Sequence, residues 1–193
     1  MVAGKDDLRD ERSKMSILLG KHIAVLVADG FEQLELTVPV TALSRVGALL
    51  SIVSPCTEYV HGWDDRDWGE RVPIDTALAS ANPNEFDALL LPGGLFSADT
   101  LRINDQVIAF TREFIERDKP IASICHSLWI LINAEGVRGR TLTSHPALRF
   151  DLENAGAEWV DRKVVVDGNL VTSRRVEDLN AFNEMMIHVI SKC

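Results

Sequence analysis

The sequence contains no apolar run near the ~18 residues that a membrane-spanning helix requires, so we expect a protein that does not cross a membrane. Residues 1–12 mix acidic and basic side chains and have no apolar centre, unlike a secretory signal. Cysteine is scarce, and the three that occur, Cys56, Cys125 and Cys193, fit no disulfide framework. These absences favour the reducing cytoplasm as the location.

Positive charge is also in short supply, with 20 Lys and Arg residues against 29 Asp and Glu and a net charge of −9. Because nucleic-acid affinity rests largely on Lys and Arg neutralising phosphates, we expect no nucleic-acid partner. The sequence has no Gly-x-Gly-x-x-Gly fingerprint, no lysine-containing phosphate loop, and no His, Cys or acidic pair at zinc-ligand spacing. We therefore expect no metal and no cofactor, and a small molecule or a protein as substrate.

A chain of 193 residues is long enough for one well-buried domain and short for two. Residues 1–20 are expected to form a polar N-terminal extension, either disordered or covering a neighbouring subunit, and residues 21–193 a single domain. Apolar patterns predict strands at 22–28, 48–54, 87–91 and 120–124, helices at 31–46, 99–117, 127–133, 146–154 and 176–190, and a hairpin of 163–166 with 169–172. This alternation predicts an α/β fold with a doubly wound, flavodoxin-like, mostly parallel sheet sandwiched by helices, whose ligands bind beyond the carboxyl ends of the strands.

The most informative residue is Cys125, which follows an apolar run at 121–124 and precedes a helical pattern at 128–132. A cysteine in the sharp turn between a buried strand and a helix occupies a nucleophile elbow. The free N–H groups of the helix start favour the thiolate, so the expected thiol pKa lies below the usual ~8.5. A lone cysteine is more often a small buried hydrophobe, but the strand–Cys–His–helix context favours a nucleophile.

Two pairs of residues are expected beside this elbow. Gly93 and Gly94 follow a predicted strand, and although such a pair is commonly a simple tight turn, here its N–H groups could hold an oxyanion together with that of His126. Glu32 and Glu35 open the first predicted helix, so one carboxyl could lean over the site while the other points away. A desolvated carboxyl there would stay protonated and donate to sulfur, whereas the simpler interpretation is that acids at a helix start satisfy its dipole.

His126, next to the nucleophile, and His145, at another strand-to-helix passage, are the histidine candidates for the site. The remaining histidines, His22, His61 and His188, have no such context and are expected at the surface or in packing.

Residues 59–71 form the one irregular insertion, expected as a surface loop that carries Trp63 and Trp68 among acidic residues. These tryptophans either narrow access to the site or make an oligomer contact, and the sequence favours neither.

Six segments of the chain resemble one known family. They are Asp-Gly-Phe-Glu-Gln-Leu-Glu (29–35), Phe-Asp-Ala-Leu-Leu-Leu-Pro-Gly-Gly (86–94), Lys-Pro-Ile-Ala-Ser-Ile-Cys-His (119–126), Arg-Gly-Arg-Thr-Leu-Thr-Ser (138–144), Asn-Ala-Gly-Ala-Glu-Trp-Val-Asp (154–161) and Val-Thr-Ser-Arg (171–174). Spanning about residues 20–191, they are similar to the PfpI/ThiJ family of the class I glutamine amidotransferase-like superfamily, which also holds the parkinsonism-associated protein deglycase.

The resemblance implies that Cys125 is the nucleophile, that Glu35 is the carboxyl closest to it, and that His126 completes a triad with an acid from a neighbouring subunit. Asp99 matches that acid, so a homodimer or higher homo-oligomer is implied; the alternative is that Asp99 only caps the helix that follows it. Glu32 matches a position expected at the subunit contact.

The PfpI branch continues Cys-His-Gly-Pro, whereas Ser127 and Leu128 follow His126 in this sequence. Ser127 adds a side chain where close backbone approach was possible, and Leu128 restores an N–H that proline lacks, so both bear on pocket shape and substrate choice. The C-terminal segment offers no His-x-Glu pair, so glutaminase activity is not expected.

These features predict a cysteine-dependent stress-defence enzyme that acts on reactive carbonyls, of the glyoxalase or protein deglycase type. Cys125 would attack the carbonyl carbon to give a hemithioacetal, loop amides would hold the oxygen, and Glu35 or His126 would move protons. The substrate would be a small carbonyl compound or a glycated protein or peptide. The alternatives are an intracellular cysteine peptidase of the PfpI type and a non-catalytic redox sensor or chaperone in which Cys125 is oxidised to sulfinate.

Overall fold

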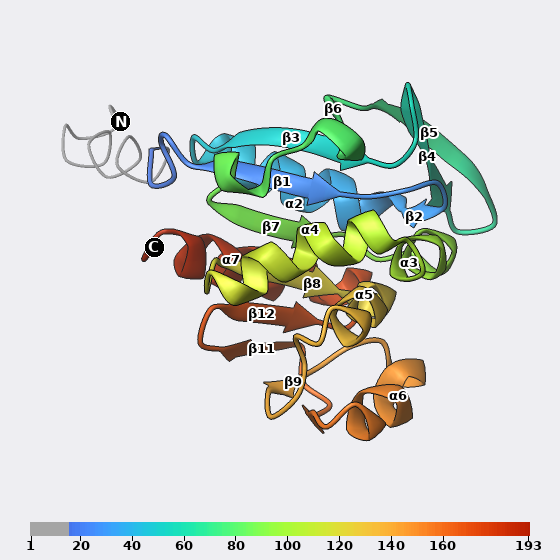
Figure 1. Ribbon diagram of the computed structural model, residues 1–193, viewed down its shortest axis with the longest axis vertical. Coiled ribbons are helices and arrows are strands. Elements are labelled where there is room, and N and C mark those ends of the chain that lie inside the picture. The colour runs from blue at the N-terminus through green and yellow to red at the C-terminus, as the bar shows by residue number, and fades with distance from the viewer. Residues whose placement is uncertain (1–15) are drawn as a thin grey trace, which may run out of the picture.

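Residues 16–193, which the computed structural model describes, form a central seven-stranded sheet between two layers of helices (Figure 1). Its strands, in spatial order, are β11 (Val164–Asp167), β12 (Leu170–Ser173), β8 (Ile121–Ile124), β7 (Ala88–Leu91), β1 (His22–Leu26), β3 (Leu49–Ser54) and β6 (Thr76–Ala77). All neighbours pair in parallel except β11 and β12, whose antiparallel hairpin forms one edge. The predicted mostly parallel α/β sheet and its hairpin are therefore confirmed.

The middle strands are buried along their whole length because helices cover both of their faces, and they are almost entirely apolar. β7 reads Ala-Leu-Leu-Leu and β8 reads Ile-Ala-Ser-Ile, and every residue of both is buried. Leu91, the last residue of β7, pairs with Ser123 of β8, so the two strands end side by side. The loops that follow them, which carry the Gly-Gly pair and Cys125, consequently start at the same edge of the sheet.

Helices α2 (Gln33–Arg45) and α7 (Leu179–Ile190) cover one face, and α3 (Leu95–Arg102), α4 (Asp105–Glu116), α5 (Leu128–Asn133) and α6 (Arg149–Asn154) lie on the side of the other. In Figure 1, α4 crosses in front of the sheet and α2 lies behind it. Alternate residues of β1 supply the two cores, since Ile23 and Val25 belong to the cluster with α2 and α7, whereas Ala24 and Leu26 belong to the other. None of the helices within residues 16–193 combines the length and hydropathy needed to cross a membrane.

The helix predicted at residues 99–117 is two helices. α3 starts at Leu95, directly after Gly94, whose φ of 106° favours glycine, and α4 starts after Asn104. The Asn104 side chain accepts hydrogen bonds from two backbone N–H groups of α4 (2.9 and 3.3 Å), a helix-start contact that interrupts the pattern. Asp99 therefore lies inside α3, and the interpretation that it caps a helix is wrong.

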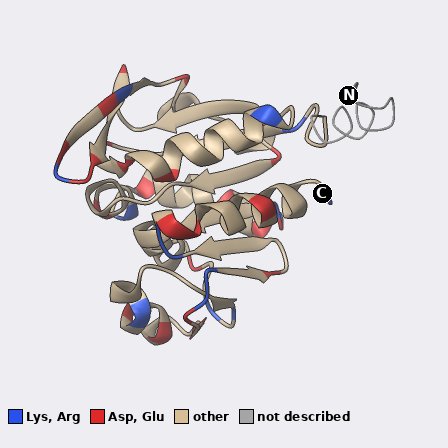
Figure 2. Cartoon of the chain, turned by 180° about the vertical axis from the view of Figure 1, so that it is seen from behind, with Lys and Arg blue, Asp and Glu red and all other residues tan. Residues whose placement is uncertain are grey.

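The insertion at residues 59–71, predicted as a loop, is a hairpin of β4 (Tyr59–Asp64) and β5 (Asp67–Pro73). β4 also pairs with β2 (Phe31–Glu32), so the first helix begins at Gln33 and not at 31. The loop prediction is wrong because one of the two inward-facing positions of β4 is Gly62, which carries no apolar signal, while Val60 is the other. Figure 2 marks the acidic positions that this hairpin carries.

The remaining elements are short. A second small sheet pairs β9 (Thr141–Leu142) with β10 (Glu158–Trp159), and 3₁₀ turns occur at Leu78–Ser80, Pro83–Glu85, Cys125–Ser127, Pro146–Leu148 and Val176–Asp178. The last three turns lead into α5, α6 and α7. Each of these helices was predicted to start within the turn that precedes it. Of the expected N-terminal extension, residues 1–15 lie outside the described residues, while Leu18 is buried and its N–H donates to the carbonyl of Val46 (2.9 Å).

Candidate active site

Cys125 sits in a sharp turn at the end of β8. Its φ is 65°, in the left-handed region that residues with a side chain rarely adopt, and the 3₁₀ turn Cys125–Ser127 leads directly into α5. Such strain persists only where the surrounding structure enforces it, and it aims the side chain out of the sheet edge. The elbow expected from the sequence is therefore present.

The hydroxyl of Ser127 links this turn to β7 and β8 by hydrogen bonds. It lies 2.7 Å from Ser123 Oγ, 2.9 Å from the carbonyl oxygen of Leu91 and 2.8 Å from that of Ile124, and it accepts from the Ile124 N–H (3.1 Å). Ser127 and Leu128 are both fully buried and neither lines the pocket at Cys125. Both side chains point into the core, so any effect that they have on pocket shape acts through the elbow and not through direct contact with a ligand.

Glu35, on the first turn of α2, faces the elbow. It is 1% exposed, and burial raises the pKa of its carboxyl to about 8, with a further contribution from the charge of Glu32. Interactions with the Cys125 thiol and the Gly93 amide act in the opposite direction but are outweighed. Glu35 is consequently protonated at neutral pH, as expected for a desolvated carboxyl.

The pKa of the Cys125 thiol differs from the expectation. Burial, together with the charge of Glu35, raises the pKa of Cys125, while the backbone N–H groups of His126 and Gly94 lower it without compensating. The elbow was expected to lower this pKa, and that expectation is wrong because Cys125 is only 8% exposed and the desolvation of its thiol outweighs the two amides. A thiol is the resting form, so a base has to remove its proton during attack.

His126 is placed to be that base. Its Nδ1 lies 3.1 Å from Cys125 Sγ, and its ring stacks on His145 with centroids 4.3 Å apart. Burial and the neighbouring His145 lower the pKa of His126 to about 4, so its ring is neutral at physiological pH and Nδ1 can accept a proton. His145 is fixed by its N–H, which donates to the Cys125 carbonyl (3.2 Å), and by its Nδ1, which accepts from Ala147 (3.2 Å).

Gly93 and Gly94 allow the strand end to approach the thiol. A Cβ on Gly93 would lie 2.0 Å from Glu35 Oε2 and 2.6 Å from the Cβ of Cys125, and one on Gly94 would lie 2.4 Å from the Glu32 nitrogen. The Gly93 amide interacts with Glu35 and the Gly94 amide with Cys125. Within residues 16–193, the amides of Gly94 and His126 interact with the Cys125 thiol, which makes them the candidate pair for a developing oxyanion.

A pocket of about 570 Å³ is lined by Glu35, Gly94, Cys125, His126 and His145, whereas Gly93 lies outside its lining. Its lining includes Glu32, Leu34, Glu35, Trp63, Asp64, Asp65, Gly94, Phe96, Cys125, His126, His145, Arg175, Val176 and Glu177. Glu32 and Glu35 both line it, so the expectation that one of them points away is wrong. Trp63 forms part of its wall, which supports the rim interpretation of the hairpin, while Trp68 is 50% exposed and does not line it.

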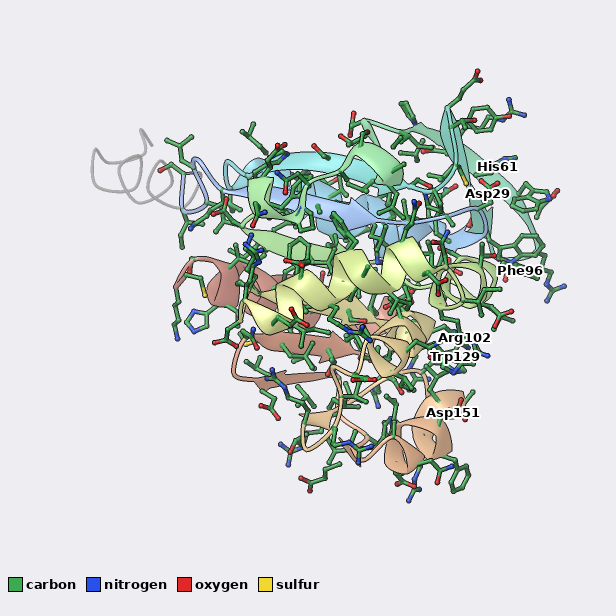
Figure 3. The ribbon with its side chains drawn as sticks, in the orientation of Figure 1. Asp29, His61, Phe96, Arg102, Trp129 and Asp151 are labelled. Carbon is green, nitrogen blue, oxygen red and sulfur yellow. The ribbon has the colours of Figure 1, made fainter. Side chains whose placement is uncertain are left out.

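Asp99 does not line this pocket. Its side chain is 62% exposed and pairs with Arg102 one turn along α3 (3.0 Å). Arg102 in turn lies over the ring of Trp129, which neighbours His126, and Figure 3 shows both labelled side chains at the strand-end side of the molecule. Within residues 16–193, the ion-pair partner of Asp99 is therefore Arg102, and no ion pair joins Asp99 to His126.

The sequence did not single out Arg175 or Glu177 as pocket residues. They follow β12, whose carboxyl end lies beside that of β8, and this topology is the signal that could have found them. Arg174 fixes the segment by ion pairs with Asp161 and Asp178. Within residues 16–193, no three His, Cys, Asp or Glu residues are grouped as a bound metal ion would need.

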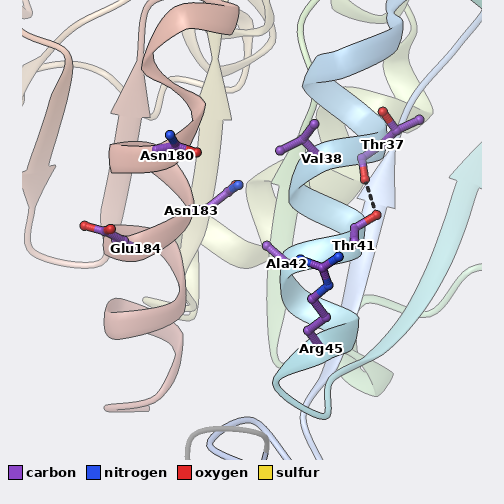
Figure 4. A pocket seen from close by; sticks show the side chains of 8 residues that line it. All are labelled: Thr37, Val38, Thr41, Ala42, Arg45, Asn180, Asn183 and Glu184. Carbon is purple, nitrogen blue, oxygen red and sulfur yellow. Dashed lines mark hydrogen bonds between the residues drawn. The ribbon is translucent and has the colours of Figure 1, made fainter.

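A second groove of about 570 Å³ lies between α2 and α7 (Figure 4). Thr37, Thr41 and Arg45 of α2 face Asn180, Asn183 and Glu184 of α7 across it. It contains no cysteine or histidine and none of the elbow residues. We therefore place the candidate active site at Cys125.

Comparison with known proteins agrees with this arrangement. The model of the DJ-1/PfpI family matches residues 21–189. The chain is 41% identical to the Bacillus subtilis protein named "Putative cysteine protease YraA" (89% of this chain, 99% of that protein), and 41% identical to Escherichia coli "Protein/nucleic acid deglycase 2" (89% and 99%). Its fold superposes on the crystal structure of Drosophila melanogaster DJ-1beta with a TM-score of 0.81 and 28% identity, covering 91% of this chain and 92% of that one. The resemblance expected from the sequence is thereby confirmed, and the chain belongs to the DJ-1/PfpI family.

Proposed function

We propose that this protein is a cysteine-dependent enzyme of stress defence that acts on reactive carbonyls, as a glyoxalase or a protein deglycase. One observation carries the proposal: a thiol on a strained elbow meets a neutral imidazole at 3.1 Å and a protonated carboxyl in one pocket. These groups supply a nucleophile, a proton acceptor and a proton donor. A pocket of about 570 Å³ suits a small carbonyl compound or a single glycated side chain.

In the proposed reaction, Cys125 Sγ attacks the carbonyl carbon and a C–S bond forms. The thiol proton passes to Nδ1 of His126, and the electron pair of the C=O bond moves to oxygen, which takes a proton from Glu35. The product of this step is a hemithioacetal, with His126 positive and Glu35 negative, and a proton returning between them restores both. The Gly94 and His126 amides stabilise the negative charge on sulfur or oxygen as it develops.

We further propose that the protein works as a homodimer or higher homo-oligomer, in which Asp99 of a second copy meets the remaining ring nitrogen of His126. Asp99 is exposed on α3, with Phe96, 54% exposed, on the same face of that helix and Ile103, 76% exposed, directly after its last residue. A carboxylate there would stabilise the imidazolium that forms during attack. Glu32, at the pocket mouth, is the residue proposed for the subunit contact.

The test is turnover of methylglyoxal and release of free amine from its adducts with N-acetylated amino acids. We expect turnover in the wild type and in Cys56→Ser, a matched change of a cysteine that does not line the pocket, and none in Cys125→Ser. Cleavage of casein or peptides that depends on Cys125 would favour the peptidase alternative. Adduct turnover that survives Cys125→Ser would contradict the proposal.

A further inference from the structure

The groove between α2 and α7 is lined by polar residues from one face of each helix. On α2 these residues recur every four positions, and on α7 they lie three and four positions apart, which are the spacings of a single helix face. They are Thr37, Thr41 and Arg45 of α2 and Asn180, Asn183 and Glu184 of α7. Polar faces of surface helices are commonly just solvated, so this pattern alone does not indicate a ligand.

Asn183 supplies a sign that this groove takes a ligand. The residue is 8% exposed, yet its Oδ1 atom has no hydrogen-bond partner among the described residues. Figure 4 shows its amide group pointing from α7 into the groove, towards α2. Buried polar atoms are normally hydrogen-bonded, so this amide fits a site that a ligand completes.

The threonines on the opposite wall present hydrogen-bond acceptors. Oγ1 of Thr37 donates its hydrogen to the carbonyl oxygen of Gln33 (2.9 Å), and Oγ1 of Thr41 donates to that of Thr37 (2.7 Å). A hydroxyl has one hydrogen and two lone pairs, so both threonine oxygens can still accept a hydrogen bond. A ligand hydroxyl suits both walls, because it can donate to these oxygens and can either donate to or accept from the Asn183 amide.

Arg45 adds a positive charge at the C-terminal end of α2. Its side chain is exposed and forms no ion pair within residues 16–193. A guanidinium binds a carboxylate through two parallel N–H···O bonds. With Glu184 contributing a negative charge on the α7 side, this one cation balances a carboxylate better than a doubly charged phosphate.

We propose that the groove between α2 and α7 binds a small polyhydroxy carboxylate, of the sugar-acid class. Arg45 holds the carboxylate, while the ligand hydroxyls bind the Asn183 amide and the threonine oxygens. The volume of about 570 Å³ is in the range of small-molecule sites. The groove shares no lining residue with the Cys125 pocket, so this site goes beyond the proposed function and does not depend on it.

Three probes of similar chain length test this assignment by NMR titration of the full chain. D-gluconate carries a carboxylate and hydroxyls, D-sorbitol has hydroxyls without the carboxylate, and hexanoate has the carboxylate without hydroxyls. We expect gluconate to bind with a Kd of about 1 mM or lower. Sorbitol and hexanoate should each bind at least about tenfold more weakly, because each lacks one of the two groups that the site recognises.

Two variants separate the contributions of charge and amide. Arg45→Gln should weaken gluconate about tenfold and leave sorbitol unchanged, since it removes the charge alone. Asn183→Leu keeps the size of the side chain, removes the amide, and should weaken gluconate and sorbitol about 3- to 10-fold each. Near-UV circular dichroism verifies that both variants are folded, and the exposed position of Arg45 keeps the test valid if Asn183→Leu does not fold.

Two further arginine variants are the matched controls. Arg162 is exposed, lines neither the groove nor the Cys125 pocket, and forms no ion pair within the described part of the chain, whereas Arg175 lines the Cys125 pocket. Arg162→Gln and Arg175→Gln should both leave the affinity for gluconate unchanged. No binding of gluconate, equal affinity for the three probes, or a loss in either control equal to that in Arg45→Gln would overturn the site.

Discussion

Nδ1 of His126 lies 3.1 Å from Sγ of Cys125, although neighbouring side chains on an extended strand would point to opposite faces. The left-handed turn at Cys125 (φ 65°) brings the two groups together at the pocket floor. The stacked ring of His145 keeps His126 in this orientation and, with burial, holds its pKa near 4. The pair therefore starts as thiol and neutral imidazole, and the thiol gives up its proton only as sulfur attacks.

The pH dependence of kcat/KM follows from these groups. Activity should rise as His126 loses its proton near pH 4 and fall as Glu35 loses its proton near pH 8, because a charged Glu35 can no longer donate and opposes negative charge on sulfur. Steady-state rates from pH 4 to 10 measure both limbs.

Glu35→Gln tests whether Glu35 causes the fall in kcat/KM near pH 8. Glutamine keeps the size and a donor but has no proton to lose, so the fall near pH 8 should disappear while the rate at pH 7 drops at least tenfold. A wild-type rate that keeps rising above pH 8 would mean that Glu35 acts as the base and not as the acid.

Glu35 should also make stability depend on pH. In the folded protein the carboxyl keeps its proton up to about pH 8, whereas the unfolded carboxyl loses it near the usual 4.5. Between these values the folded state binds more protons, so the free energy of unfolding falls as pH rises. From pH 5 to 8 the wild type should lose up to on the order of 4 kcal/mol more than Glu35→Gln.

Urea denaturation at both pH values and at equal protein concentration measures this difference. His126 titrates over part of the same range but is present in both proteins, so the comparison cancels its contribution. Parallel pH profiles for the two proteins would show that Glu35 ionises as an ordinary carboxyl.

The predictable parts of this protein are those that depend on local pattern. The buried runs in β7 and β8 and the cysteine between a strand and a helix indicated both the sheet and the nucleophile. The hairpin was missed because Gly62 fills an inward position, and the break between α3 and α4 because Asn104 interrupts an otherwise helical pattern. The sign of the Cys125 pKa shift could not be predicted, since it depends on how deeply distant segments bury the sulfur.

Ser127→Ala should loosen the elbow. The serine hydroxyl connects β7, β8 and the turn, and its loss leaves buried partners at Ser123 and Ile124 unsatisfied. We expect a loss of about 1–3 kcal/mol in stability and a lower kcat with little change in KM, because Ser127 does not line the pocket. Ser80→Ala, which removes an exposed hydroxyl bonded to one carbonyl, is the control and should have little effect on either. Normal kcat and stability in Ser127→Ala would show that the turn is held without this hydroxyl.

The last prediction concerns Asp99 as a residue shared between copies. Asp99→Ala and Cys125→Ala should each be inactive or nearly so, and mixing them under conditions that exchange subunits should restore activity. In a dimer with two equivalent sites, random mixing makes half of the dimers mixed, and one site in each has both wild-type residues. About a quarter of wild-type activity should therefore return. Mixing Cys125→Ala with Glu35→Gln is the control, because both residues line the pocket of one chain and no exchange can reunite them. A monomer by light scattering, or no recovery after exchange verified by mass spectrometry, would rule out the shared site and leave Cys125, His126 and Glu35 as a site within one chain.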